Sequence, residues 1–265
     1  MLLCDGKRVE IGHFPDGTIM MKHGVEPRSA HEIVWKFENN EELVALVYLT
    51  NHIRTHSKSQ TIYLRMPYIP NARQDRVKHP EDVFTLKWFA SIINSLHFSG
   101  VTITDPHSSV AEALIDNVFV KRADLKIGEA LEIVTGLSGD TPILMFYPDE
   151  GAMKRYADAT ELPYAFGIKK RDWKTGQILG LDVSGEVELI RGHNILIVDD
   201  ICSKGGTFTH SARKLKELGA ERIFLYVTHC ENTITQGSIL TDGLIERVFT
   251  TDSILTAANE MIEVI

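Results

Sequence analysis

Short apolar runs alternate with stretches of helical periodicity along the whole chain. Runs with the length and branched apolar composition of strands occupy residues 31–37, 61–66, 101–104, 142–147, 164–168, 194–198, 222–228, 247–250 and 261–265. Apolar residues recur with helical spacing in residues 41–56, 81–96, 151–159 and 208–218. Short apolar strands that alternate with helices predict mainly parallel sheets covered by helices on both faces.

This alternation runs through twice, with a break near residues 136–140, where Gly136 and Gly139 lie. We therefore expect an α/β fold of two stacked domains, residues 1–138 and residues 139–265. In open parallel sheets a ligand binds beyond the carboxyl ends of the strands. We expect the site there, between the two domains.

Composition and charge narrow the class of protein. The chain has 265 residues, 43% of them hydrophobic, a net charge of −8 and a pI near 5.8, which argue against a nucleic-acid surface as its main function. The three cysteines have neither zinc-site nor disulfide spacing, and no apolar run approaches the length of a membrane span. These features predict a protein of the reducing cytoplasm with no membrane or nucleic-acid partner.

One stretch combines a buried strand, two acids and a glycine loop. The apolar residues 194–198 lead into Asp199 and Asp200, and the string Ser203-Lys-Gly-Gly-Thr207 precedes the helical residues 208–218. A strand, loop and helix in this order aim backbone N–H groups and a helix N-terminus at one point, which suits a phosphate. The alternative is an ordinary turn after a parallel-sheet strand.

The individual residues of this stretch fit a phosphorylated ribose. Gly205 and Gly206 permit close approach of the backbone, and Thr207 adds a hydroxyl. The carboxylates of Asp199 and Asp200 can hold ribose hydroxyls or a magnesium ion. The pattern resembles the phosphoribosyl diphosphate motif shared by phosphoribosyltransferases and phosphoribosyl diphosphate (PRPP) synthetases, and it implies that Ser203 and Lys204 belong to the same phosphate loop.

A second string separates these two families. Residues 67–75 read Pro-Tyr-Ile-Pro-Asn-Ala-Arg-Gln-Asp and follow a predicted strand, and the two prolines favour an ordered loop. Arg73 offers a planar fork for phosphate oxygens, and Gln74 can bond a base or a sugar. The string closely resembles the Pro-Tyr-Ala-Arg-Gln-Asp signature of PRPP synthetases, and this resemblance implies that Arg73, Gln74 and Asp75 bind ATP.

Further resemblances to the same family follow in its order. Thr104-Asp-Pro-His107 resembles the Asp-Leu-His element, and residues 147–155 resemble the element that opens the second domain. The resemblance implies that His107 and Asp149 are ligands of Mg²⁺. Residues 166–171 end in Lys-Lys-Arg and match the family's Lys-x-Arg, which implies that Lys169 and Arg171 are catalytic and stabilise charge on the transferred group.

The string His13-Phe-Pro-Asp-Gly-Thr18 resembles a family loop that reaches the ATP of a neighbouring subunit. Phe14 and Asp16 match this loop, and Thr18 replaces its usual glutamate. The three residues are therefore expected to bind ATP. A plain Asp-Gly turn between strands is the alternative explanation.

The resemblance implies two stacked phosphoribosyltransferase-like domains and a ribose-phosphate pyrophosphokinase. This enzyme moves the β,γ-diphosphoryl group of MgATP to the C1 hydroxyl of ribose 5-phosphate and forms PRPP and AMP. A homo-oligomer, a dimer or the family's hexamer, is implied as well. Family members carry a strand and a helix before the loop that corresponds to Phe14, whereas only thirteen residues precede Phe14 here. They also carry a helix after the segment that corresponds to residues 261–265. We therefore expect the packing of the first domain and the oligomer to differ from those of the family.

The phosphate loop departs from the family pattern Asp-Thr-x-Gly-Thr at Ser203 and Lys204, which makes it more positive by about two charges. A larger or more anionic 5′-substituted ribose such as ADP-ribose is therefore an alternative acceptor. A phosphoribosyltransferase, or an inactive regulatory homologue that binds nucleotide, are the further alternatives.

Overall fold

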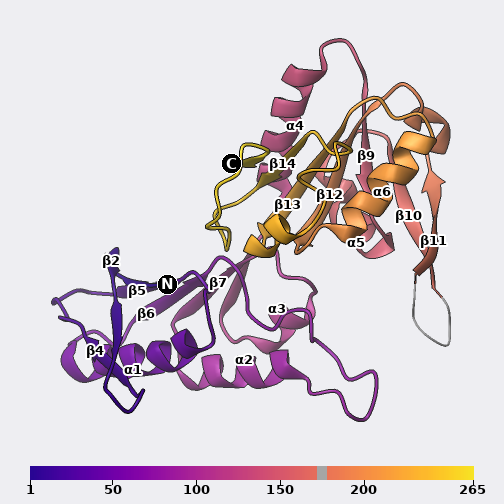
Figure 1. The fold of residues 1–265 in the computed structure, drawn as a ribbon. Helices are drawn as coiled ribbons and strands as arrows, with labels where there is room; N and C mark the ends of the chain where they lie inside the picture. Colours follow the sequence, from indigo (N-terminus) through magenta and orange to yellow (C-terminus); the bar gives the residue numbers. More distant parts are fainter. Residues whose placement is uncertain (172–177) are drawn as a thin grey trace. The chain divides into compact units, whose positions relative to one another are not determined.

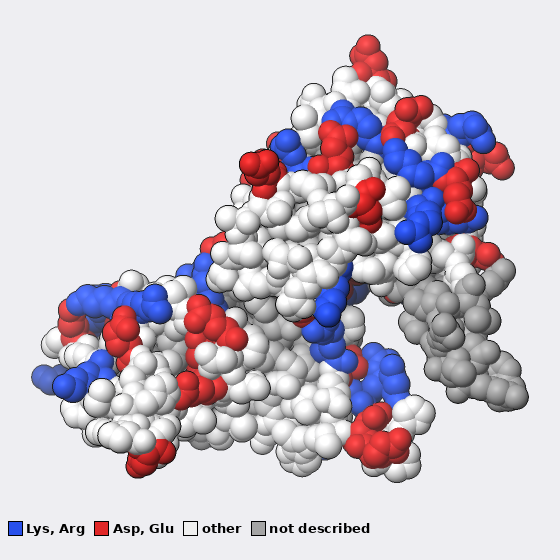
Figure 2. All heavy atoms as spheres, in the orientation of Figure 1, with Lys and Arg blue, Asp and Glu red and all other residues white. Residues whose placement is uncertain are grey.

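The protein consists of two compact units, Met1–Arg122 and Ala123–Ile265 (Figure 1). The computed structural model describes the backbone of residues 1–171 and 178–265, and the side chains of 169–179 lie outside what it describes. None of the described helices is both long and apolar enough to cross a membrane. Acidic and basic side chains are interspersed on the face of each unit that Figure 2 shows.

A mainly parallel sheet of six strands forms the first unit. Its strand order is β2 (Lys7–Arg8), β1 (Leu2–Cys4), β5 (His31–Trp35), β6 (Ile62–Met66), β7 (Gly100–Thr104) and β8 (Val118–Lys121). The strands from β5 to β8 pair in parallel, whereas β1 pairs antiparallel with both β5 and β2. A separate hairpin joins β3 (Glu10–His13) to β4 (Ile19–Lys22).

Helices of this unit share one apolar cluster with the sheet. The helices are α1 (Glu41–His56), α2 (Thr85–Ser95) and the short α3 (Val110–Leu114). On β6, Ile62, Leu64 and Met66 are buried in this cluster, whereas Tyr63 between them is 47% exposed. Such strict alternation is typical of a sheet with one covered face. The expected helix cover on both faces is therefore wrong for the first unit, because its described helices share a single core.

A seven-stranded sheet forms the second unit. Its order is β11 (Ile178–Gly185), β10 (Tyr164–Arg171), β9 (Ile143–Tyr147), β12 (Asn194–Cys202), β13 (Ile223–Cys230), β14 (Arg247–Thr250) and β15 (Ile262–Val264). Only the edge strand β11 runs antiparallel to its neighbour. The carboxyl ends of β9, β12 and β13 consequently meet at one edge of the sheet.

Helices cover both faces of the second sheet, as expected. One face buries Ile195 and Ile197 of β12 with residues of α6 (Gly206–Glu217). The other face buries Leu196 and Val198 with residues of α4 (Asp124–Ser138) and α5 (Glu150–Tyr156). Continuous burial of the central strands explains their unbroken apolar sequences. Short 3₁₀ turns complete the unit at Ala157–Ala159, Val187–Ile190 and Asn232–Gln236.

All nine expected strands and all four expected helices are present, with shifts of a few residues at their ends. The sequence reading missed the strands β1 to β4, β8 and β11 and the helices α3 and α4. Three short strands, rather than a strand and a helix, precede Phe14. The side chains of Ile127, Ala130 and Val134 on α4 pack on the second sheet, so the compact units divide after Arg122, earlier than the boundary expected at residue 138.

Candidate functional site

Three carboxylates gather at the carboxyl edge of the second sheet. Asp199 and Asp200 belong to the end of β12, and Asp149 follows the neighbouring strand β9 and caps α5 by accepting the N–H of Ala152 at 3.1 Å. The backbone N–H of Asp200 donates to the Asp199 carboxylate at 2.9 Å. We call these three residues the acid cluster.

Burial and mutual repulsion disfavour the charged carboxylates of the acid cluster. Burial raises the pKa of Asp199 well above its ordinary value, and the charges of Asp200 and then Asp149 raise it further. Asp200 is buried, and Arg155 compensates it in part, with Nη1 3.5 Å from Oδ2. A hard divalent cation coordinated by oxygen would relieve this repulsion, so the acid cluster fits Mg²⁺.

The phosphate loop joins β12 to α6 as the sequence predicts. Gly205 takes the left-handed conformation at φ 78°, and α6 begins at Gly206. The first amides of a helix have no partner inside it, so those at the start of α6 are available to an anion. Lys204 is exposed, and its ammonium group forms no ion pair or hydrogen bond with any residue that the structure describes.

A segment distant in sequence packs directly against this loop. The hydroxyl of Ser203 lies 3.1 Å from that of Thr233, which in turn donates to Glu231 at 3.1 Å. A Cβ atom added to Gly237 would lie 1.8 Å from the carbonyl oxygen of Lys204. Residues 231–239 therefore form a wall of the phosphate loop. The sequence reading missed this wall, because only the parallel pairing of β12 with β13 brings it there.

The Arg73–Asp75 string follows β6 in the first unit. Asp75 is 5% exposed and accepts two hydrogen bonds from Arg76, at 2.7 and 3.0 Å. These bonds, followed by Ser108 and the charges of Arg76 and His107, lower the pKa of Asp75 to about 2 although burial opposes them. The structure thus brings His107 close to Asp75, although their strings lie far apart in the sequence.

The remaining residues of this string face different neighbours. Gln74 accepts a hydrogen bond from Thr85 at the start of α2 at 2.9 Å, and Arg73 is exposed. His107 supplies an imidazole, a ligand that suits zinc and other transition metals better than Mg²⁺. On donor chemistry alone, the acid cluster is the better match for Mg²⁺.

The Phe14 loop is the tip of the β3–β4 hairpin. Asp16 accepts hydrogen bonds from the backbone N–H and the hydroxyl of Thr18, at 3.0 and 2.7 Å, and these bonds lower its pKa. Phe14 is 50% exposed. Asp16 and Thr18 therefore stabilise the turn and leave the aromatic ring of Phe14 accessible.

Lys169 and Arg171 lie on the backbone of β10, where they pair with Leu181 and Ile178 of β11. Their side chains lie outside the described residues, so their expected catalytic role stays a prediction.

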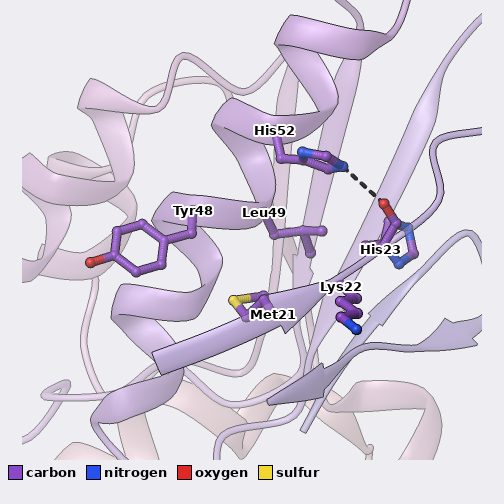
Figure 3. Close-up of a pocket in the computed structure, with 6 residues that line it drawn as sticks. All are labelled: Met21, Lys22, His23, Tyr48, Leu49 and His52. Atoms are coloured by element: carbon purple, nitrogen blue, oxygen red, sulfur yellow. Dashed lines mark hydrogen bonds between the residues drawn. The ribbon is translucent and has the colours of Figure 1, made fainter. Parts of the chain in front are cut away.

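A cavity of about 500 Å³ lies between β4 and α1, apart from all of these residues. Figure 3 shows Leu49 and Met21 between Tyr48 on one side and His52 and His23 on the other, with Lys22, the last residue of β4, next to His23. The ring of His52 hydrogen-bonds the carbonyl oxygen of His23 at 2.9 Å. None of the residues predicted to bind substrate lines this cavity.

Comparisons with known proteins agree with the geometry. Residues 153–242 match the model of the phosphoribosyl transferase domain. Ribose-phosphate pyrophosphokinase from Shewanella oneidensis is 27% identical over 261 residues, which cover 96% of this chain and 80% of that protein. The enzyme of the same name from Thermosipho africanus is 29% identical over 249 residues, covering 90% of this chain and 73% of the relative.

The crystal structure of phosphoribosylpyrophosphate synthetase from Mycobacterium smegmatis has the same fold. It superposes with a TM-score of 0.80 and 19% identity, over 97% of this chain and 85% of that one. The similarity over 90% or more of the chain and the matched phosphoribosyl transferase domain make the chain a distant homologue of the ribose-phosphate pyrophosphokinases (PRPP synthetases), whose two mainly parallel α/β units it shares.

Proposed function

We propose that the protein is a ribose-phosphate pyrophosphokinase that converts MgATP and ribose 5-phosphate to PRPP and AMP. The C1 hydroxyl oxygen attacks the β-phosphorus of ATP, the bond from that phosphorus to the α,β-bridging oxygen breaks, and AMP leaves with this oxygen. The hydroxyl proton passes to solvent. Such a transfer depends on positioning and charge neutralisation more than on covalent chemistry by the protein.

The acid cluster next to the phosphate loop is the observation that carries this proposal. Asp199 and Asp200 lie near the carboxyl end of β12, and the free amides of α6 begin a few residues later, so a ribose diol and its 5′-phosphate can be held together. The carboxylates of Asp199 and Asp200 bind the hydroxyls, while Gly205, Gly206 and Thr207 bind the phosphate. Mg²⁺ would neutralise phosphate charge when bound. Asp149 of the acid cluster would supply it with an oxygen ligand, and His107 is a further ligand only on the family resemblance.

ATP-binding roles follow from the family and from exposure. Arg73 and Gln74 are accessible beyond the carboxyl end of β6 and bind the nucleotide, with Asp75 fixing the loop through Arg76. Phe14 presents an exposed ring that suits stacking on a base. Lys169 and Arg171 meet the charge that develops on the transferred group.

A product assay tests the proposal. The protein is incubated with MgATP and ribose 5-phosphate, and AMP and PRPP are followed by chromatography and phosphorus NMR. We expect both products in equal amounts, and we expect Lys169→Ala to lower kcat far more than it raises the KM for ATP. Production of neither compound by a folded sample would overturn the proposal and favour the inactive homologue. Consumption of added PRPP with a base, without ATP, would favour a phosphoribosyltransferase.

Lys204, which has no ionic partner among the described residues, favours a second acceptor, a ribose with a more anionic 5′-substituent such as ADP-ribose. Its ammonium group is exposed beside the loop that receives the 5′-phosphate, where family members have an uncharged threonine. The same assay with ADP-ribose separates the two acceptors. AMP formed only with ADP-ribose would replace ribose 5-phosphate as the substrate and keep the chemistry.

A further inference from the structure

Three side chains with metal-ligand chemistry converge in the first unit, outside every motif discussed above. The Sγ atom of Cys4, a carboxylate oxygen of Asp5 and a ring nitrogen of His31 all lie within 4.8 Å of one another. Cys4 ends β1, Asp5 is in the turn to β2, and His31 begins the neighbouring strand β5. Thiolate, carboxylate and imidazole are the ligand types that proteins use for zinc.

The backbone holds this trio in place before any ion is present. The N–H of Asp5 donates to the carbonyl of Glu32 at 2.9 Å, and the N–H of Glu32 donates back to the Asp5 carboxylate at 3.0 Å. Register pairing of Cys4 with Ile33 continues the same ladder. The turn and the start of β5 are therefore locked together, so little order has to be created when a ligand binds.

His31 is oriented as a metal-binding histidine should be. Its Nδ1 lies 2.8 Å from Oδ2 of Asp5, and its Nε2 lies 2.9 Å from the hydroxyl of Ser57. Metal-bound histidines usually donate their second N–H to an oxygen acceptor, which fixes the ring and the tautomer. In the ion-free protein Nδ1 donates to the carboxylate of Asp5, which can only accept. When an ion takes Nδ1, the ring N–H moves to Nε2, where the hydroxyl of Ser57 accepts it.

The local charges also suit a cation. Burial alone would raise the pKa of Asp5, but the hydrogen bonds from Glu32 and His31 lower it below its ordinary value, so Asp5 is a carboxylate. Arg28 approaches Asp5 to 3.4 Å, and its own charge is offset by Glu26 at 3.2 Å. Burial, and then the charge of Asp5, raise the pKa of Cys4 to about 12, so the thiol keeps its proton until an ion replaces it.

We propose that Cys4, Asp5 and His31 form a binding site for a zinc-class divalent ion. One ion binds the thiolate of Cys4, a carboxylate oxygen of Asp5 and Nδ1 of a neutral His31 whose N–H is on Nε2. Binding releases the Cys4 thiol proton to solvent, so one proton leaves for each ion. A water molecule completes the four-coordinate shell.

This site is independent of the proposed reaction. His31 begins β5 at the amino edge of the parallel strands, whereas Arg73 and His107 follow the carboxyl ends of β6 and β7. Its soft thiolate excludes Mg²⁺ as a competitor, because Mg²⁺ requires oxygen ligands. The ion would tie the β1–β2 turn to the start of β5 and so stabilise the first unit.

Titration of the metal-free protein with Co²⁺ in the presence of excess Mg²⁺ tests the site. We expect one ion per chain, a thiolate-to-cobalt charge-transfer band, and release of one proton per ion from the Cys4 thiol at about pH 8. Zn²⁺ should remove the band and raise the melting temperature. Absence of the band from the wild-type protein would overturn the proposal without any variant.

Variants assign the ligands. Cys4→Ser should abolish the charge-transfer band and weaken Zn²⁺ binding at least about tenfold, whereas Cys202→Ser and Cys230→Ser should keep both. Asp5→Asn is the second variant if Cys4→Ser fails to fold, as judged by circular dichroism, and it should weaken binding while keeping the thiol. His52→Asn controls for adventitious binding by His52 and His56, whose rings stack at 4.3 Å on α1. A band that persists in Cys4→Ser, or disappears in Cys202→Ser, would overturn the assignment.

Discussion

At the scale of single residues, the second unit concentrates negative charge where folding alone would avoid it. Asp199 and Asp200 are consecutive, and Asp149 comes close enough to affect the titration of Asp199. Arg155 is positioned to offset part of this charge. From the sequence, Asp149 was predicted as a ligand of Mg²⁺ and Asp199 and Asp200 as residues that hold the ribose hydroxyls or a metal ion, since all three follow apolar strand-like runs. It did not predict Arg155 as the partner of Asp200, because that pairing depends on how α5 packs.

The acid cluster should therefore destabilise the protein when no cation is bound. The pKa of Asp199 is higher in the folded protein than its ordinary value of 3.8, so the folded state binds more protons than the unfolded state above pH 3.8. Stability conferred by the protonated carboxyl is consequently lost as the pH rises through the raised folded pKa. Asp199→Asn should increase the free energy of unfolding at pH 8 without Mg²⁺ by at least about 1 kcal/mol, the lower end of the cost of a buried group without a compensating partner.

Urea denaturation at pH 5 and pH 8 checks this. The gain from Asp199→Asn should be larger at pH 8 than at pH 5, and Mg²⁺ with substrates should stabilise the wild-type protein more than the variant. Asp140→Asn, at an exposed acid of the same unit, is the control and should change little. A variant less stable than wild type at pH 8 would contradict the account of charge repulsion.

Lys204 is the residue of the phosphate loop that we expect to change its preference between acceptors. If its ammonium group binds a second phosphate, Lys204→Thr should raise the KM for ADP-ribose by about tenfold, since a charge-assisted hydrogen bond is worth about 1.5–3 kcal/mol. The KM for ribose 5-phosphate should change much less. Steady-state assays with both acceptors measure this, and Lys58→Thr, at an exposed lysine of the first unit, is the matched control. Equal KM changes for the two acceptors would show that Lys204 does not distinguish ADP-ribose from ribose 5-phosphate.

At the scale of elements, the sequence predicted the strands and helices that depend on local burial patterns. Strands such as β9, β12 and β13 are buried on both faces, so their apolar runs stand out in the sequence. Helix α4 was missed although Ile127, Ala130 and Val134 have helical spacing, because Gly136 and Gly139 have low helix propensity and indicated a break. The wall formed by residues 231–239 was missed because long-range sheet pairing, which leaves no local pattern, creates it.

Glycines at these two places should respond in opposite ways to the same substitution. A Cβ atom at Gly237 would lie 1.8 Å from the backbone oxygen of Lys204, so Gly237→Ala must displace either the wall or the phosphate loop and should cost more than about 2 kcal/mol. Gly128 has open space around it inside α4, so Gly128→Ala should stabilise the protein by about 0.5–1 kcal/mol.

Thermal and chemical denaturation of both alanine variants measure the two effects. Gly237→Ala should also raise the KM for the ribose phosphate, because the displaced backbone belongs to its binding loop. Gly128→Ala is remote from that loop and should leave the KM unchanged. Equal stability of Gly237→Ala and wild type would show that the wall yields without cost, and that it does not support the loop.

At the scale of the whole molecule, the described residues form three separate apolar clusters. One apolar cluster serves the first unit, and the two clusters of the second unit lie on opposite faces of its sheet. Alternating strands and helices were enough to predict two α/β units. The position of the division was harder to predict, because it depends on which of the two sheets α4 packs on. Sequence periodicity indicates that one face of a helix is buried, but it does not indicate which sheet covers that face.

The division after Arg122 leads to a prediction about fragments. Residues 123–265 contain α4 and both clusters of the second unit, so this fragment should fold as a cooperative, monodisperse domain. Residues 139–265 lack α4 and would expose the face that includes Met145, Leu196 and Phe224, all fully buried in the protein. An exposed apolar face of this kind favours aggregation, so the shorter fragment should aggregate or remain partly unfolded. Circular dichroism melts, size-exclusion chromatography and amide NMR dispersion of the two fragments compare them directly. If 139–265 folded as well as 123–265, α4 would be dispensable to the second core, and the division at residue 138 would describe the molecule better.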